Sequence, residues 1–141
     1  MKISSFSRIK RGIFDTNMKR VKVQFEYILK ASPTIVYRFL TTPECLVRWF
    51  CDSIDIFGDQ YTFEWENSEE VANLIDDIED EFLKFVWEGR ETEFLSYKME
   101  TAELTRETVL TITDFCDPGE EKYYKDMWDA LIKDLKVATG G

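Results

Sequence analysis

Alternation between apolar and polar residues is the most regular feature of the first part of the chain. Between positions 20 and 30, every second side chain is apolar and most of the others are polar. Successive side chains of a strand point to opposite faces, so this period of two predicts a strand with one buried and one solvated face. The apolar positions are Val21, Val23, Phe25, Tyr27 and Leu29.

Two proline-containing segments follow this strand, and each predicts the start of a short helix. Ser32 precedes Pro33, and Thr42 precedes Pro43. A hydroxyl residue followed by proline is typical of the cap and the first position of a helix. We expect the first helix to end near Leu40 and the second to last one to two turns.

The middle of the chain returns to the strand period of two in several short runs. Turn signals separate these runs, and the clearest is Gly58-Asp59, a pair that favours tight hairpins. The connections are short, so we expect neighbouring strands to pair as an antiparallel meander. The predicted strands are 52–57, 60–66, 70–78, 81–88, 92–101 and 107–115.

The C-terminal segment changes to a helical spacing of three and four residues, which predicts a long helix. Glu120 and Glu121 suit its positive end, and Lys133 and Lys136 suit its negative end. The whole pattern predicts an α+β fold: an antiparallel sheet of six to seven strands, two short helices after the first strand, and a long terminal helix. The apolar helix positions are Tyr124, Met127, Trp128, Leu131, Ile132 and Leu135.

Several motifs with defined spacing occur together along the body of the chain. They are Ala31-Ser32-Pro33-x-x-Val36-Tyr37, Leu40-Thr41-Thr42-Pro43-Glu44-x-Leu46-x-x-Trp49-Phe50, Phe63-x-Trp65, Phe85-x-Trp87-Glu88, the run Val109 to Phe115, and Trp128-Asp129-x-x-Ile132-x-x-Leu135-Lys136. This set resembles the START-like proteins of the SRPBCC helix-grip superfamily, which include relatives of the activator of heat-shock-protein-90 ATPase (AHSA1). The match runs from about Val21 to Gly140 and looks especially like small stand-alone START-like proteins of Bacteroidetes-type bacteria.

The resemblance implies the helix-grip fold, in which a curved sheet wraps the terminal helix and a cavity can lie between them. It implies no single function, because proteins with this fold carry lipids, bind hormones, cyclise aromatic polyketides or act as co-chaperones.

Composition removes several classes of chemistry. The 141 residues include no histidine, which excludes Ser-His-Asp and Cys-His nucleophiles and His-ligated zinc. The cysteines, Cys45, Cys51 and Cys116, form no Cys-x-x-Cys pair, which favours reduced thiols and a cytoplasmic location. From the sequence alone we therefore assign no catalytic residue, no metal and no cofactor.

Charge is unevenly distributed along the chain. Residues 1–22 carry seven basic and one acidic side chain, a net charge of +6, whereas the whole chain is at −10 and the remaining 119 residues at −16. A body this acidic repels phosphate backbones, so no nucleic-acid partner is expected. No apolar run reaches the roughly 18 residues of a membrane span.

The basic N-terminal stretch is interpreted as separate from the domain. We expect a flexible extension over residues 1–19 and one START-like domain over residues 20–141, since chain ends without docking contacts usually fray. The strand pattern begins just after Met18, which is therefore a candidate for the functional start of the protein.

An aromatic set lies on the faces that the sheet and the terminal helix are expected to turn toward each other. Aromatic walls with a few polar tips suit a ring-bearing or acyl ligand. Buried aromatic residues usually only pack, so a ligand pocket and a filled core both stay open. The candidate ligand-binding residues are Trp49, Phe63, Trp65, Phe85, Trp87, Tyr97, Asp114, Tyr124 and Trp128.

Asp114 follows Ile112 by two residues and is expected to share its inward face. A buried carboxylate has a raised pKa and can act as an acid or base, but such an aspartate more often caps the next turn through nearby amides. Tyrosine hydroxyls could also belong to the site, where they either donate to a ligand carbonyl or only reach the rim of the cavity. The candidates are Tyr27, Tyr97 and Tyr124.

Five acidic side chains lie within positions 76–81. This run lacks the glycine and the distal glutamate of an EF-hand loop, so we interpret it as a solvated hairpin tip rather than a calcium site. It can also guide a basic partner.

Three functions are therefore compared. The first is binding of a hydrophobic or aromatic small molecule in the cavity between sheet and helix, by a monomer or weak homodimer. The second is an AHSA1-like co-chaperone or interaction module that uses its acidic surface to bind a protein, for instance a chaperone. The third and weakest is a cyclase-like enzyme that uses Asp114 and a tyrosine.

Overall fold

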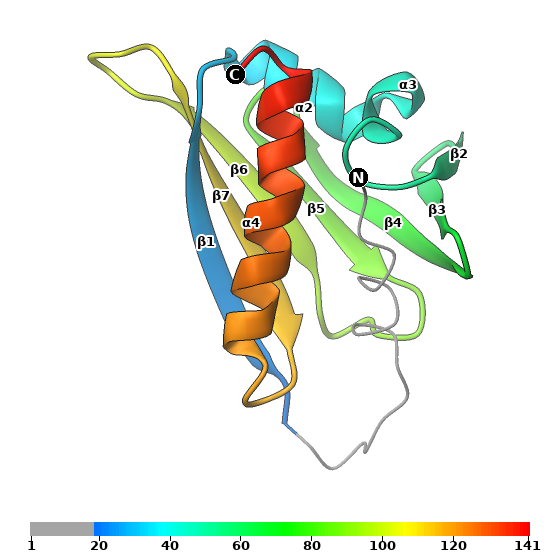
Figure 1. The fold of residues 1–141 in the computed structure, drawn as a ribbon. Helices are drawn as coiled ribbons and strands as arrows, with labels where there is room; N and C mark the ends of the chain where they lie inside the picture. The colour runs from blue at the N-terminus through cyan, green and yellow to red at the C-terminus, as the bar shows by residue number, and fades with distance from the viewer. Residues whose placement is uncertain (1–18) are drawn as a thin grey trace.

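The computed structural model of the protein describes residues 19–141 (Figure 1). The expectation of a flexible extension over residues 1–19, and of a functional start at Met18, falls outside the described residues except for Lys19.

Seven strands form one antiparallel sheet in the order β1-β7-β6-β5-β4-β3-β2. Strands β2 to β7 are neighbours in sequence order, which confirms the predicted meander, and β1 adds to its far side by pairing with β7. The register of β1 and β7 runs without a shift from Val21 opposite Cys116 to Leu29 opposite Thr108. The strands are β1 (Val21–Leu29), β2 (Ser53–Phe57), β3 (Gln60–Trp65), β4 (Ser68–Ile78), β5 (Phe82–Trp87), β6 (Leu95–Thr101) and β7 (Thr108–Cys116).

Two short helices connect β1 to β2. Ser32 caps α2 (Pro33–Thr41) as predicted, because its side-chain oxygen accepts a hydrogen bond from the backbone nitrogen of Ile35 at 3.4 Å. The second cap is different: Thr42 precedes α3 (Pro43–Leu46), but its side chain makes no capping bond. This helix is also a single turn, at the short end of the expectation, and turns follow it.

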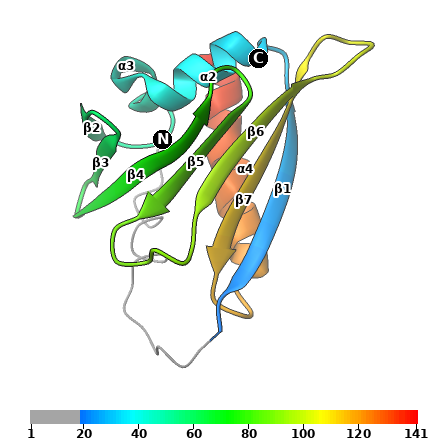
Figure 2. The same ribbon diagram turned by 180° about the vertical axis from the view of Figure 1, so that it is seen from behind.

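The long helix α4 (Glu121–Ala138) lies against one face of the curved sheet, with α2 and α3 at one end (Figures 1 and 2). This arrangement confirms the predicted α+β helix-grip architecture. All six predicted apolar positions of the helix are buried, and none is more than 4% exposed.

A β-bulge interrupts the pairing of β4 with β5. Leu74 lies opposite Phe85 and Asp76 lies opposite Lys84, so Ile75 is the extra residue. A bulge bends its strand and increases the local twist, which contributes to the curvature of the sheet around α4.

The packing of α4 gives a direct test of the fold. Leu131 is fully buried, whereas Val137 on the same helix is 74% exposed. We expect Leu131→Ala to lower the free energy of unfolding by about 2 to 5 kcal/mol, because it removes buried carbon and leaves a cavity. The matched control Val137→Ala should change it by less than about 0.5 kcal/mol. Urea unfolding monitored by tryptophan fluorescence measures both changes. Equal losses of stability for the two variants would contradict the packing of α4 described here.

Candidate functional site

The nine predicted site residues all lie in the interior, and none is more than 4% exposed. Ring-to-ring contacts with centroid distances of 5.9 to 6.5 Å link six of them directly, namely Phe63, Trp65, Phe85, Trp87, Tyr97 and Trp128. These rings come from β3, β5, β6 and α4, so the inner face of the sheet and the helix meet through aromatic side chains.

Phe50 contacts three of these rings, and the sequence analysis did not select it as a site residue. Its ring centroid lies 5.1 Å from that of Phe63, 5.6 Å from Trp65 and 6.2 Å from Trp128. Phe50 belongs to the turns after α3, where no periodic pattern shows which way a side chain points. Its position next to Trp49, which it contacts at 5.2 Å, was the only signal.

Two of the predicted residues lie toward the edges of this cluster. The indole of Trp49 donates a hydrogen bond to the backbone carbonyl of Phe39 at 2.9 Å, which ties the turns after α3 to α2. Tyr124 contacts Tyr123, with centroids 6.4 Å apart, and lies near Arg20.

Asp114 is fully buried on β7 and accepts two hydrogen bonds from the described residues. One carboxylate oxygen accepts from the indole nitrogen of Trp128 at 3.0 Å, and the other accepts from the backbone nitrogen of Phe115 at 2.8 Å. The expectation of an inward carboxylate that bonds a nearby amide is therefore confirmed. The bond from α4 was not foreseen, because Trp128 is on another element.

Tyr97 lies close to this carboxylate. It is opposite Ile112 in the β6–β7 register, which makes it a diagonal neighbour of Asp114 on the same face. Burial, with smaller effects of Asp114 and Cys51, raises the pKa of Tyr97 well above its ordinary value, so the hydroxyl keeps its proton.

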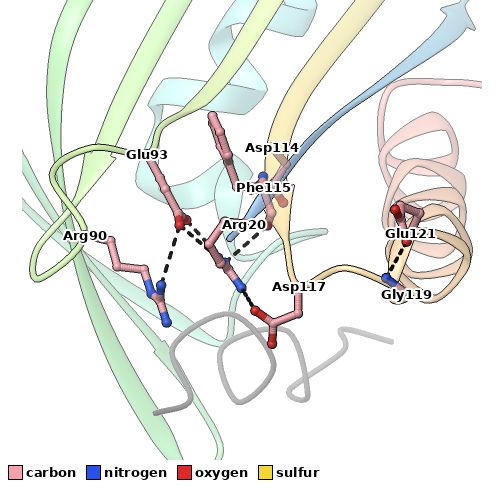
Figure 3. Close-up of polar contacts among 8 residues, drawn as sticks. All are labelled: Arg20, Arg90, Glu93, Asp114, Phe115, Asp117, Gly119 and Glu121. Carbon is pink, nitrogen blue, oxygen red and sulfur yellow. Dashed lines mark hydrogen bonds and ion pairs between the residues drawn. The ribbon is translucent and has the colours of Figure 1, made fainter. Parts of the chain in front are cut away.

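A cluster of charged side chains lies where β1 begins and β7 ends (Figure 3). The Arg20 guanidinium donates to Glu93 at 2.8 Å and to Asp117 at 2.7 Å, and Arg90 lies 3.5 Å from the same Glu93. Arg20 also donates to the carbonyl of Phe115 at 3.4 Å. The cluster thus ties the β5–β6 loop and the β7–α4 loop to the first strand.

Burial and pairing have opposite effects on the pKa of Arg20. Desolvation acts to lower it, but the hydrogen bonds that the guanidinium donates to Glu93 and Asp117 outweigh desolvation and raise the pKa above the ordinary value. The Glu93 side chain is only 8% exposed, so this carboxylate depends on the arginine for compensation. Sequence reasoning missed the cluster because its partners are 73 and 97 residues apart along the chain.

The acidic run at 76–81 forms the exposed tip of the β4–β5 hairpin, as predicted, but two of its carboxylates also contact α2. The hydroxyl of Tyr37 donates to Asp77 at 2.6 Å, and that of Thr34 donates to Asp80 at 2.8 Å. These bonds fix the hairpin to the helix and involve no ion.

Other chemistry is limited in the described part of the chain. Within residues 19–141, no group of three or more His, Cys, Asp or Glu is placed to hold a metal ion. The three cysteines are free thiols, and burial raises the pKa of Cys116 to about 12. None of the helices in this region is both long and apolar enough to span a membrane.

Two surface grooves are present near α4, and neither is lined by a predicted site residue. One, of about 230 Å³, lies between β1 and α4 and is lined by Tyr27, Asp129, Ile132, Lys133 and Lys136. Here the Tyr27 hydroxyl donates to Asp129 at 2.8 Å, so this tyrosine is at the rim. The other, of about 290 Å³, is lined by Arg48, Asp134, Val137 and Ala138.

Comparison with known families agrees with this architecture. Residues 17–141 match the START-like superfamily domain, and the chain therefore belongs to the START-like superfamily. Comparison with proteins of curated function gave no match.

Solved structures show the same fold. The Aha1 dimer from Colwellia psychrerythraea is 20% identical with a TM-score of 0.74, and the match covers 84% of this chain and 96% of that one. BfR322 from Bacteroides fragilis is 29% identical with a TM-score of 0.64, covering 88% and 94%. SSP2350 from Staphylococcus saprophyticus is 19% identical with a TM-score of 0.69, covering 83% and 90%.

The charged cluster predicts a measurable contribution to stability. Arg20→Gln leaves the buried Glu93 with only the longer 3.5 Å contact to Arg90, so we expect it to lower the free energy of unfolding by about 1.5 to 3 kcal/mol. The control Lys122→Gln removes an ion pair in which the side chains are 85% and 61% exposed, and should cost at most about 0.5 kcal/mol. Thermal and urea unfolding measure both changes. Equal values for the two variants would contradict the role assigned to Arg20.

The raised pKa of Tyr61 predicts that the stability of the fold depends on pH in the alkaline range. Its ring lies 5.0 Å from Phe85, and burial, followed by Asp77 and Asp59, raises its pKa to about 12. The unfolded chain ionises near pH 10, so the raised pKa stabilises the fold below pH 10 and this contribution is lost between about pH 10 and 12. In Tyr61→Phe, the free energy of unfolding should fall less steeply with pH in this window than in the original protein. An unchanged slope would contradict the raised pKa of Tyr61.

Proposed function

We propose that the protein binds a neutral hydrophobic molecule, with a ring or acyl body and one polar end, between the sheet and α4. The coarse assignment follows from the fold, since a START-like fold is typically a hydrophobic-ligand-binding domain. The finer one is supported by the aromatic cluster, because ring faces contact an apolar ligand without leaving polar groups unpaired.

The observation that carries this proposal is the Tyr97 hydroxyl. It belongs to a buried tyrosine whose ring lies 6.2 Å from that of Trp128 and 6.4 Å from that of Phe85, diagonally across from Asp114. Burial keeps the hydroxyl protonated, so it is able to donate a hydrogen bond to a ligand. We assign to Tyr97 the role of donor to a carbonyl or hydroxyl of the ligand.

The polarity of the site restricts the ligand further. Asp114 is fully buried and its oxygens already accept hydrogen bonds from Trp128 and Phe115, so an anionic head group would enter a region of low dielectric without a cation to compensate it. We therefore propose that neutral alcohols, phenols or ketones bind better than fatty acids. The aromatic rings must separate to admit such a molecule, so binding requires a rearrangement in the region between β5 and α4.

Binding is tested by titrating the purified protein with N-phenyl-1-naphthylamine. We expect saturable probe fluorescence with one site per chain, and energy transfer from tryptophans in the cluster. Mass spectrometry of an organic extract of native protein should identify the natural ligand. Absence of saturable binding, together with an empty extract, would refute the proposal.

The role of Tyr97 is tested by comparing 2-naphthol with naphthalene. Tyr97→Phe keeps the ring and removes the hydroxyl, so the affinity for 2-naphthol should fall by about two- to tenfold, the value of one hydrogen bond of about 0.5 to 1.5 kcal/mol. The affinity for naphthalene should not change. Tyr123→Phe, on an exposed tyrosine of α4, is the matched control. Equal losses for both ligands would contradict a hydrogen-bond donor.

A second proposal, an interaction module for a basic protein, is supported by the acidity of the body, where residues 23–141 sum to −16. Salt screens such an association, so pull-down of a partner should be lost on raising the salt concentration. A partner whose binding does not depend on salt would contradict it.

The free state of all three cysteines supports the cytoplasm as the location for either function.

A further inference from the structure

Among the described residues 19–141, no strand pairs with the outer edge of β1. In this part of the chain β1 pairs only with β7, and in both views no other labelled element lies beside its outer edge (Figures 1 and 2). Half of the backbone groups of an edge strand point outward and are available to another strand. The opposite edge, β2, is only five residues long, while β1 has nine.

The strand also lacks several of the features that prevent edge pairing. Proteins protect long edges with proline, with bulges or with charges that point into the core. Val21–Leu29 contains no proline, its register with β7 has no shift, and its charged side chains, Lys22 and Glu26, lie on the solvated face. This edge is therefore regular enough to accept a partner strand.

The charges on this face are complementary to a second copy of the same strand. In an antiparallel pair around a two-fold axis at Gln24, Lys22 of each copy lies opposite Glu26 of the other. Opposite charges directly across a pair of strands attract. An axis at Glu26 instead would oppose Glu26 to itself and Lys22 to Lys30, which is repulsive.

The same register matches the other face of the strand. Paired residues must share a face, so shifts by one residue are excluded. An axis at Gln24 sets Val23 opposite Phe25 and Val21 opposite Tyr27. Phe25 and Tyr27 are partly exposed at this edge, so apolar surface would be covered in both copies. An axis at Phe25 would form neither ion pair.

We propose that two copies of this chain associate through antiparallel pairing of their β1 strands, with the two-fold axis at Gln24, to form one continuous sheet. The interface consists of one strand pair with two Lys22–Glu26 ion pairs, so association is concentration-dependent and sensitive to salt. It leaves the aromatic interior of each copy untouched, and binding of a hydrophobic ligand neither requires nor prevents it.

Cysteine cross-linking tests the register. At the axis the two Cα atoms are about 4.5 to 5.5 Å apart, which suits a disulfide. In a Cys45→Ser background, Gln24→Cys should therefore form a disulfide-linked dimer under mild oxidation. Lys22→Cys is the matched control on the same face, because its two copies would be about 13 Å apart at about 3.3 Å per residue. Faster cross-linking of the control, or of Phe25→Cys, would overturn the proposed register.

Charge exchange tests the association independently, by sedimentation velocity over a range of concentrations. Lys22→Glu and Glu26→Lys each oppose like charges, so each should weaken dimerisation by at least tenfold. The double variant restores opposite charges and should return to within threefold of the original. A mixture of the two single variants should form heterodimers. Lys98→Glu, on an exposed position of β6, controls for net charge and should leave the dimer unchanged.

The proposal fails if the original protein stays monomeric at all concentrations, or if the double variant does not recover association. The side chains of Lys22, Gln24, Glu26 and Lys98 are exposed, so folding of the variants at these positions can be verified by an unchanged melting temperature. Probe binding by the monomeric variants keeps this result separate from the ligand proposal.

Discussion

The hydrogen bond between the Trp128 indole and the Asp114 carboxylate is the contact on which the rest of the interior depends. It joins α4 to β7 at a distance of 3.0 Å, and both side chains are fully buried. A carboxyl group inside an aromatic core is costly unless it is hydrogen-bonded. The bond therefore fixes both the position of α4 on the sheet and its rotation, since other rotations would leave Asp114 without the indole. The rings of Phe50 and Tyr97 then pack on Trp128 in this orientation.

Local periodicity was sufficient to predict the elements, because each is read from neighbouring residues. The strand over Val21–Leu29 and the buried face of α4 follow directly from periods of two and of three to four. The inward position of Asp114 followed from the same rule. What local rules cannot supply is the meeting of distant segments: Phe50 lies in a turn without a period, and Arg20 meets partners that only the tertiary fold brings close. The predicted cap at Thr42 was wrong for a related reason, since a residue type that suits a cap does not ensure that its side chain forms the capping hydrogen bond.

Absence of histidine and burial of polar groups together shape what the interior can do. The chain has no histidine, so it has no imidazole side chain that titrates near neutral pH. Burial moves the pKa of Tyr97 further from neutrality. Buried hydroxyls such as that of Tyr97 thus stay protonated over the physiological range. Such groups are suited to recognise a molecule by hydrogen bonds rather than to transfer protons to it.

The pairing of the first strand with the last strand has a consequence for how the protein is made. Val21 lies opposite Cys116, so β1 cannot take its place in the sheet until β7 has left the ribosome. Domains whose contacts join distant parts of the sequence fold slowly, because the loop between the contacts must first be closed. During synthesis β1 therefore waits as an unpaired amphipathic strand while the meander of β2 to β6 assembles. Final closure of the domain is coupled to completion of nearly the whole chain.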